Sequence, residues 1–229
     1  MTTESRDVVI VGGGIVACLT GYLLGRQGYK VTILEADSLG SHASGFAFGG
    51  LDPLTGVGTP YPLLEFSLWC YGRHRGLARE LHDYTGIDVG FELRDRLHLA
   101  FTEEEAAESK KNIEWMKDVG GFNVEWVDTQ RALELEPQVS GVCIGALFEQ
   151  SPGALEPYRF ILAAMRAGES YGVEMVQRRA IGLITEGDRC TGVQLENGTI
   201  NAGIVLLAMG PWTGLASEWC GVNIPVTPL

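Results

Sequence analysis

The hydrophobic pattern of the chain begins with a short apolar run near the N-terminus. Residues 8–11 are β-branched and apolar on both faces, which predicts a strand buried inside a parallel sheet. Three consecutive glycines follow, and an apolar pattern with helical spacing then extends over residues 15–27. Residues 30–34 predict a second strand that ends at Glu35. The start of the chain therefore predicts a strand–helix–strand unit.

The glycines between the first strand and the helix have the spacing of a dinucleotide fingerprint. Gly12 suits a tight turn, Gly14 lets the backbone approach a pyrophosphate, and Ala17 stands where a third small residue allows close packing. The helix N-terminus that follows would direct its N–H groups at the phosphates. Glu35 lies 23 residues after Gly12, close to the spacing of about 20 residues expected for a ribose-binding carboxylate.

Small residues also recur along one face of the predicted helix. Ala17, Gly21 and Gly25 are spaced by four and form a single stripe. A glycine inside a helix costs up to about 1 kcal/mol relative to alanine. The stripe therefore predicts backbone that packs tightly on a sheet, and Gly28 is expected to end the helix.

The middle of the chain alternates helical and strand-like patterns. A long helix is expected over residues 61–84, and a strand within residues 91–101. Thr102 precedes three glutamates, which is typical of a helix N-cap with an acidic first turn rather than of a metal site. Another helix is predicted to begin at Asp128 and to end at Pro137.

The last third predicts one helix and several strands. Pro157 is expected to open a helix that runs to about residue 170. The strand-like segments are residues 173–177, 180–186, 190–195 and 204–208. An Asn197-Gly198 turn precedes the last of them. That last segment is continuously apolar, as a buried parallel strand should be.

Composition and charge exclude several classes of protein. Hydrophobic residues make up 45% of the 229 residues and charged residues 20%, which is typical of a globular chain. The net charge of −12 argues against a nucleic-acid partner. The five cysteines contain no C-x-x-C pair, so we expect neither a metal site nor disulfides, and reduced thiols favour a cytoplasmic location. The polar N-terminus and the interrupted apolar run predict no signal peptide and no membrane span.

The segment after the second strand separates FAD from a nicotinamide cofactor. A nicotinamide domain would continue with another helix and strand, whereas residues 41–51 read S-H-A-S-G-F-A-F-G-G-L. Such a segment is too rich in glycine, serine and alanine to predict either element. Its small residues let the backbone lie along a flat ligand, so a nicotinamide-binding module is the weaker alternative.

Together with these features, the chain resembles the FAD-dependent D-amino-acid oxidase superfamily, and within it glycine oxidase and its sarcosine-oxidase-like relatives. The N-terminal fingerprint V-V-I-V-G-G-G-I-V-A with I-L-E-A matches that family, and residues 43–51 resemble its second small-residue loop. G-A-L-E-P-Y-R-F at 153–160 and V-L-L-A-M-G-P-W at 205–212 resemble two later family segments. These motifs lie in the family order and cover nearly the whole chain.

The resemblance implies a set of residues that bind FAD non-covalently. Ile15 and Val16 would offer backbone to the pyrophosphate, and Glu35 with Ala36 would hold the adenosine ribose. The remaining residues that the resemblance implies at the cofactor are Ala43, Ser44, Phe48, Gly49, Gly50, Ala180 and Gly210, together with Gly12, Gly14 and Ala17 of the fingerprint. Phe46 and Phe48 are bulkier than the small residues usual in this loop. His42 lacks the Trp-His context in which some relatives attach FAD covalently, and we expect it to be a polar loop residue.

The resemblance further implies an α/β fold in two domains. A Rossmann-like FAD-binding domain would be formed by residues 1–55 and 151–229, with an inserted α+β substrate domain that begins over 56–150. Family members continue for well over a hundred residues, so we expect a chain truncated at its C-terminus. The substrate-binding arginine and tyrosine, and the last FAD-binding glycine segment, would lie beyond Leu229. The first 229 residues alone should then not turn over substrate.

The function implied is oxidation of a small amino acid or an N-methyl amine, with hydride transfer to the flavin and oxygen as acceptor. No His, Cys or Lys is identified as a general base, so the catalytic residues are unknown, and Arg73, Arg75 and Arg94 are better explained as surface charge. The alternatives are a dehydrogenase of the same fold that uses a quinone or a protein acceptor, and a non-catalytic flavin-binding subunit. The expected partner is the small substrate, and a homo-oligomer stays open.

Overall fold

The computed structural model describes residues 5–54, 62–150 and 152–226. Its internal contacts divide the chain into two compact units. The first unit is Met1–Phe48, Leu77–Val89 and Glu156–Leu229, and the second is Gly49–Gly76 and Gly90–Leu155. The long helix α2 (Leu64–Thr85) thus contributes its C-terminal half to the first unit. The functional assignment of the two units as FAD-binding and substrate domains, with the boundaries given above, stays a prediction.

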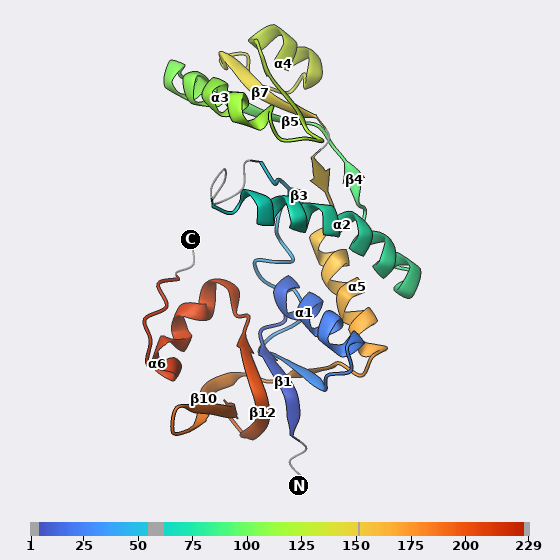
Figure 1. Ribbon diagram of the computed structural model, residues 1–229, viewed down its shortest axis with the longest axis vertical. Coiled ribbons are helices and arrows are strands. Elements are labelled where there is room, and N and C mark those ends of the chain that lie inside the picture. Colours follow the sequence, from blue (N-terminus) through green and yellow to red (C-terminus); the bar gives the residue numbers. More distant parts are fainter. Residues whose placement is uncertain (1–4, 55–61, 151, 227–229) are drawn as a thin grey trace. The chain divides into compact units, whose positions relative to one another are not determined.

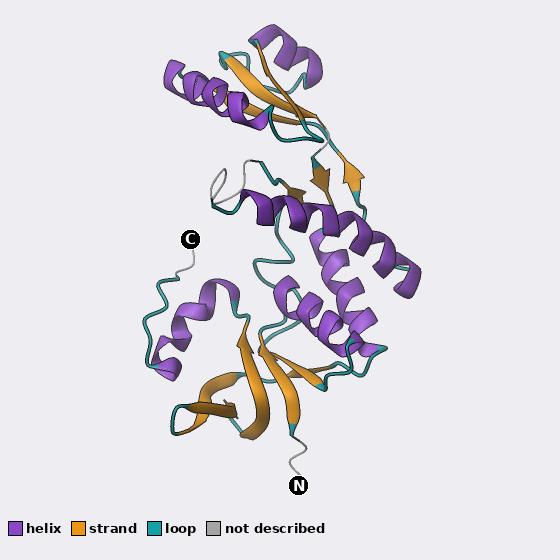
Figure 2. Cartoon of the chain, viewed as in Figure 1, coloured by secondary structure: helices purple, strands orange, loops and turns teal. Residues whose placement is uncertain are grey.

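A six-stranded mixed sheet forms the centre of the first unit (Figures 1 and 2). Its strands lie in the order β10-β11-β12-β1-β2-β9. β12, β1, β2 and β9 run parallel, whereas β10, β11 and β12 pair antiparallel. The bounds are β1 Arg6–Val11, β2 Val31–Glu35, β9 Glu174–Gln177, β10 Ala180–Glu186, β11 Arg189–Leu195 and β12 Gly198–Leu207.

Strand β1 lies in the middle of this sheet, as its apolar sequence predicts. Val9 and Ile10 are completely buried. Val9 is opposite Val205 of β12 on one side and Thr32 of β2 on the other. Because these strands are parallel, their carboxyl ends meet at one edge of the sheet, which is where open α/β sheets bind their ligands.

Helices α1 (Ile15–Arg26) and α5 (Pro157–Glu169) lie side by side against the sheet (Figure 1). The stripe of small residues on α1 makes this close packing feasible. A Cβ atom on Gly21 would lie 3.0 Å from the side chain of Ile33, and one on Gly25 would lie 2.6 Å from that of Val173. The tight helix packing predicted from the stripe is confirmed.

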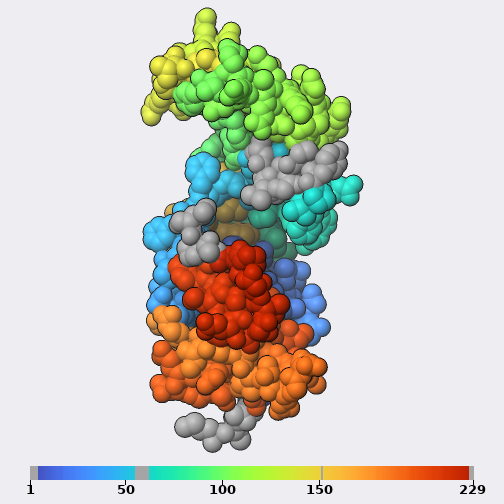
Figure 3. All heavy atoms as spheres, turned by 90° about the vertical axis from the view of Figure 1, so that its left-hand side faces the viewer, coloured from blue at the N-terminus to red at the C-terminus, as the bar shows by residue number. Residues whose placement is uncertain are grey.

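The segment after β12 lies across the sheet from α1. It forms the 3-10 helix η1 (Gly210–Ala216) and the short helix α6 (Ser217–Cys220). Figure 3 shows this red segment as a compact block on one side of the first unit, next to the orange strands of the sheet. At the carboxyl ends of the parallel strands, α1 therefore lies on one face of the sheet and η1 on the other.

The second unit contains a three-stranded antiparallel sheet in the order β5-β7-β6. Its strands are β5 Arg96–Ala100, β6 Asn123–Val127 and β7 Gly145–Gln150, and its helices are α3 Glu103–Met116 and α4 Thr129–Leu135. Leu147 of the central strand packs with Ile113 and Met116 of α3. Phe148, the next residue, packs on the opposite face with Ala132 of α4. The unit is thus a sheet covered by one helix on each face.

A smaller sheet in the second unit joins β3 (Gly50–Leu51), β8 (Gly153–Ala154) and β4 (Glu92–Leu93). The strand predicted within residues 91–101 is confirmed as β5, and the same stretch also contains the short strand β4, which belongs to a different sheet. The predicted N-cap of α3 is confirmed, since Thr102 and Glu105 form a reciprocal capping box. Over the described residues, no helix combines the length and the apolar character that crossing a membrane requires.

Candidate cofactor-binding site

The glycine turn between β1 and α1 needs glycine for two reasons. Gly12 has φ +111°, a conformation that other residues rarely adopt. A Cβ atom at this position would lie 2.3 Å from the carbonyl oxygen of Ala208, just beyond β12. The Gly12 N–H donates to the carbonyl of Leu34 at 2.7 Å. The turn therefore passes directly between the ends of β12 and β2, as the tight turn predicted from the sequence requires.

The N-terminus of α1 is open at the same edge of the sheet. Gly14 is the N-cap and, having no side chain, does not cap the helix itself. The Ile15 N–H lies 3.3 Å from the hydroxyl oxygen of Ser44 and donates to it. A Cβ atom on Gly14 would lie 2.8 Å from that same oxygen. The structure thus brings Gly14, Ile15 and Ser44 together at the positive end of a helix, where anions are favoured.

Glu35 lies at the carboxyl end of β2 and faces the glycine turn. Its side chain is buried, with a relative exposure of 9%. One carboxylate oxygen accepts the Gly13 N–H at 2.5 Å, and the other accepts the Asp37 N–H at 2.8 Å. Each carboxylate oxygen can accept a second hydrogen bond. The side chain therefore fixes the turn and still has acceptor capacity for a ligand hydroxyl.

Cys18 lies below the glycine turn, on the buried face of α1. Its sulfur lies 3.7 Å from the carbonyl oxygen of Gly13 and donates to it. Burial, assisted by the charge of Glu35, raises the pKa of the Cys18 thiol to about 12. The thiol is therefore protonated at neutral pH, and it is a packing residue rather than a nucleophile.

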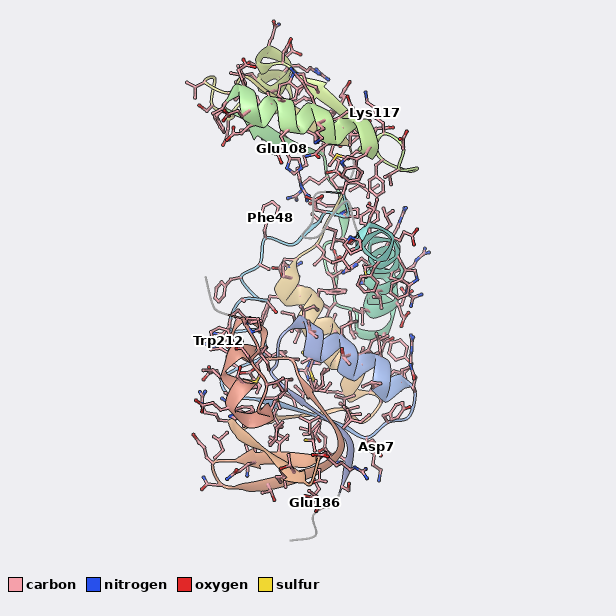
Figure 4. The ribbon with its side chains drawn as sticks, turned by 60° about the vertical axis from the view of Figure 1, so that its left-hand side comes forward. Asp7, Phe48, Glu108, Lys117, Glu186 and Trp212 are labelled. Carbon is pink, nitrogen blue, oxygen red and sulfur yellow. The ribbon has the colours of Figure 1, made fainter. Side chains whose placement is uncertain are left out.

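Three separate segments meet at the rim of the site around Asp37. The Asp37 carboxylate lies 2.8 Å from Nε2 of His42 and 3.6 Å from Nη2 of Arg179. The His42 ring is tilted against that of Trp212, with centroids 5.0 Å apart. Figure 4 shows Trp212 on the segment that follows β12. The loop after β2, the β9–β10 connection and η1 are thereby joined around one opening.

A cavity of about 600 Å³ lies inside this ring of segments. That volume is within the range of roughly 300–1,000 Å³ for small-molecule sites. The predicted cofactor residues that line it are Gly12, Gly14, Val16, Glu35, Ala36, Ala43, Ser44, Ala180 and Gly210. Residues from the N-terminal and the C-terminal segments of the first unit thus line a single cavity.

The other predicted cofactor residues lie elsewhere. Ala17 is completely buried and Ile15 is absent from the lining, although its N–H faces Ser44. Phe48 projects from its loop with a relative exposure of 87% (Figure 4). Gly49 and Gly50 belong to the second unit.

Several lining residues were not assigned to the cofactor from the sequence. These are Gly13, Asp37, His42, Arg178, Arg179, Met209, Trp212, Thr213 and Trp219 among others. Arg178 and Arg179 follow directly after β9, a parallel strand, so the rule that ligands bind at the carboxyl ends of such strands could have identified them. The arginines proposed and dismissed earlier lie in the second unit, where Arg94 pairs with Glu92.

The family profile described as FAD dependent oxidoreductase (DAO) matches residues 7–229. The chain belongs to this family. It is 29% identical over 228 residues to the glycine oxidase of Geobacillus kaustophilus (strain HTA426), an alignment that covers 99% of the chain and 60% of the relative. It is 28% identical over 232 residues to sarcosine oxidase subunit beta of an Arthrobacter species, covering 97% of the chain and 55% of the relative.

The fold agrees with this membership. The crystal structure of glycine oxidase from Geobacillus kaustophilus matches with a TM-score of 0.91 at 29% identity, over 99% of the chain and 61% of the solved structure. The α/β fold class and the D-amino-acid oxidase resemblance predicted from the sequence are therefore confirmed. The chain spans about 60% of the length of this glycine oxidase.

Proposed function

We propose that the first unit binds FAD non-covalently in the 600 Å³ cavity. The observation that carries this proposal is the glycine turn at the carboxyl end of β1. There, Gly12 and Gly14 leave no room for side chains, and the N-terminus of α1, whose N-cap residue has no side chain, faces the cavity. A helix N-terminus with this environment suits a pyrophosphate. The residues present therefore fit the cofactor of the family.

Named groups on the cavity wall would hold the separate parts of the cofactor. The backbone of Gly14 and Ile15 with the Ser44 hydroxyl would bind the pyrophosphate, and Glu35 would accept hydrogen bonds from the adenosine ribose. Ala180 would place its backbone at the adenine. His42 is engaged with Asp37 and Trp212, which supports a non-covalent attachment.

We further propose that the whole protein is an oxidoreductase for a small amino acid or an N-methyl amine. Bound FAD supplies a two-electron acceptor for the oxidation of a C–N bond. The overall reaction would consume oxygen and water and would release hydrogen peroxide. Similarity to a glycine oxidase and to a sarcosine oxidase subunit supports this class of substrate. The chain's own contribution is to bind the cofactor, to orient it and to shield it from water.

Peroxide release in air by the whole protein tests the activity. Glycine, sarcosine and several D-amino acids are supplied in turn, and electron delivery to an artificial quinone is measured under argon in parallel. We expect one peroxide for each substrate molecule oxidised. Quinone reduction with no peroxide would instead identify a dehydrogenase, and a flavin that no substrate in this class can reduce would reject the proposed substrate class.

A further inference from the structure

The second unit holds a buried carboxylate that has no hydrogen-bond partner among the described residues. Glu149 lies on the central strand β7 and its side chain is completely buried. Neither of its oxygens accepts a hydrogen bond from any residue that the structure describes. A buried charge is expensive unless it is paired or coordinates a metal, so this position requires a positively charged neighbour.

The nearest candidate is His98 on the adjacent strand β5. Its Nε2 atom lies 3.8 Å from Oε2 of Glu149 and, within the described part of the chain, makes no hydrogen bond. Arg96 is opposite Glu149 in the sheet, and His98 is opposite Leu147, so all four share one face. That face is the apolar one covered by α3. Two unsatisfied polar groups therefore point at each other from neighbouring strands in an apolar setting.

Asp52, which follows β3, completes a cluster of three. One ligand atom from each of Asp52, His98 and Glu149 can be chosen such that all three lie within 4.8 Å of one another. Arg96 forms an ion pair with Asp52. A cation bound among these three side chains would satisfy the buried oxygens of Glu149 and the Nε2 atom of His98, which otherwise accept or donate no hydrogen bond among the described residues.

We propose that Asp52, His98 and Glu149 form a binding site for a divalent transition-metal ion, with Zn²⁺ the ion that fits best. One imidazole with two carboxylates is a ligand set that zinc accepts, whereas calcium and magnesium prefer oxygen alone. Tetrahedral ligands at the usual zinc distances are about 3.3 Å apart, so modest side-chain rotations would close the cluster. A water molecule would take the fourth position.

The cluster is also open enough for an ion to enter. The side chains of Asp52 and His98 are 23% and 33% exposed, whereas Glu149 is fully buried behind them. Arg96 forms its ion pair with the Asp52 carboxylate beside the cluster. The three ligands come from three elements far apart in the sequence, which is why no ligand spacing revealed them.

A competition titration with Zn²⁺ and a chromophoric chelator tests this site in the purified, metal-free chain. We expect one Zn²⁺ per chain, and an affinity reduced at least tenfold in Glu149→Gln and in His98→Gln, since even outer-shell changes at metal sites cost tenfold or more. Both substitutions keep a similar shape. The matched controls are Glu125→Gln, an exposed residue of β6 on the sheet face opposite that of Glu149, and His82→Gln on α2, and both should bind as the unaltered chain does.

Two further readings separate this site from adventitious binding. Cys220 is exposed, so Co²⁺ is used to detect sulfur ligation through its thiolate charge-transfer absorption, which we expect to be absent. Zn²⁺ should also raise the Tm of the unaltered chain and of both controls, because ligand binding stabilises the folded state. Glu149→Gln should fold and yet show no such rise. Thiolate absorption, equal affinity in all five proteins, or no saturable Zn²⁺ binding would overturn the proposal.

Discussion

At the scale of single residues, Gly12 connects the fold to the site most directly. Two features exclude a side chain at this position: the positive φ, and the carbonyl oxygen of Ala208, which would lie 2.3 Å from an added Cβ. Gly12→Ala should therefore destabilise the chain by more than the roughly 1–2 kcal/mol that a left-handed conformation costs by itself. Urea unfolding measures the loss.

Gly28 provides the matched control for that substitution. It has φ +89°, but none of the described residues lies within 4 Å of a Cβ added there. Gly28→Ala should cost about 1–2 kcal/mol from the backbone conformation alone. Equal losses in the two variants would show that the contact between the turn and β12 is not tight.

Cys18 gives a pH dependence whose sign follows from its burial. The unfolded thiol ionises at about pH 8.5, whereas burial holds the pKa of the folded thiol at about 12. Between these values the unfolded state binds fewer protons, so the free energy of unfolding falls as pH rises. The contribution is complete below about pH 8.5 and is lost as the pH approaches the folded pKa.

Urea unfolding of the unaltered chain and of Cys18→Ala at several pH values from 8 to 11 measures this contribution. The difference in stability between the two proteins should shrink steadily as the pH increases. Other groups that titrate in this range are present in both proteins and cancel in the difference. A difference that does not change with pH would mean that water reaches the thiol.

At the scale of elements, replacing a glycine by alanine should have opposite effects on stability in two helices, at Gly25 of α1 and at Gly76 of α2. Gly25→Ala would place a Cβ 2.6 Å from Val173 and should destabilise, because that turn before β9 must move. Gly76 lies inside helix α2 with no described atom within 4 Å of an added Cβ. Gly76→Ala should stabilise by roughly 0.5–1 kcal/mol. Thermal unfolding compares the two variants. If both substitutions stabilised the chain, the close packing of α1 against Val173 would be contradicted.

Elements with a clear local signal were predictable from the sequence. The helix α1, the capped helix α3 and the Pro157 start of α5 follow from periodicity, capping residues and proline. β6 and β7 gave no such signal. β7 ends in two polar residues, Glu149 and Gln150, and its place is set by pairing with β5 and β6 on both sides. Tertiary pairing of this kind cannot be read from one segment.

At the scale of the whole molecule, the sequence predicted those residues of the site that lie at or just after the ends of the strands β1 and β2. Gly12, Gly14 and Glu35 meet because β1 and β2 are parallel neighbours. The contacts within the rim were not predictable, although the position of Arg179 after a strand was, because the order of β2 and β9 in the sheet brings Asp37 and Arg179 together. Long-range contacts of this kind depend on topology, and no local pattern contains them.

The cofactor proposal is tested most directly by equilibrium titration of the cofactor-free chain with FAD, in which the quenching of flavin fluorescence measures binding. We predict saturable binding of one FAD per chain that NAD does not displace. Glu35→Ala should weaken it by about 1.5–3 kcal/mol, the range for hydrogen bonds to a charged group, and Gly14→Val should weaken it further. The control Glu186→Ala, on the β10 hairpin end outside the cavity lining, should bind normally. An unchanged FAD affinity in Glu35→Ala and Gly14→Val, or no saturable binding at all, would contradict the proposed site.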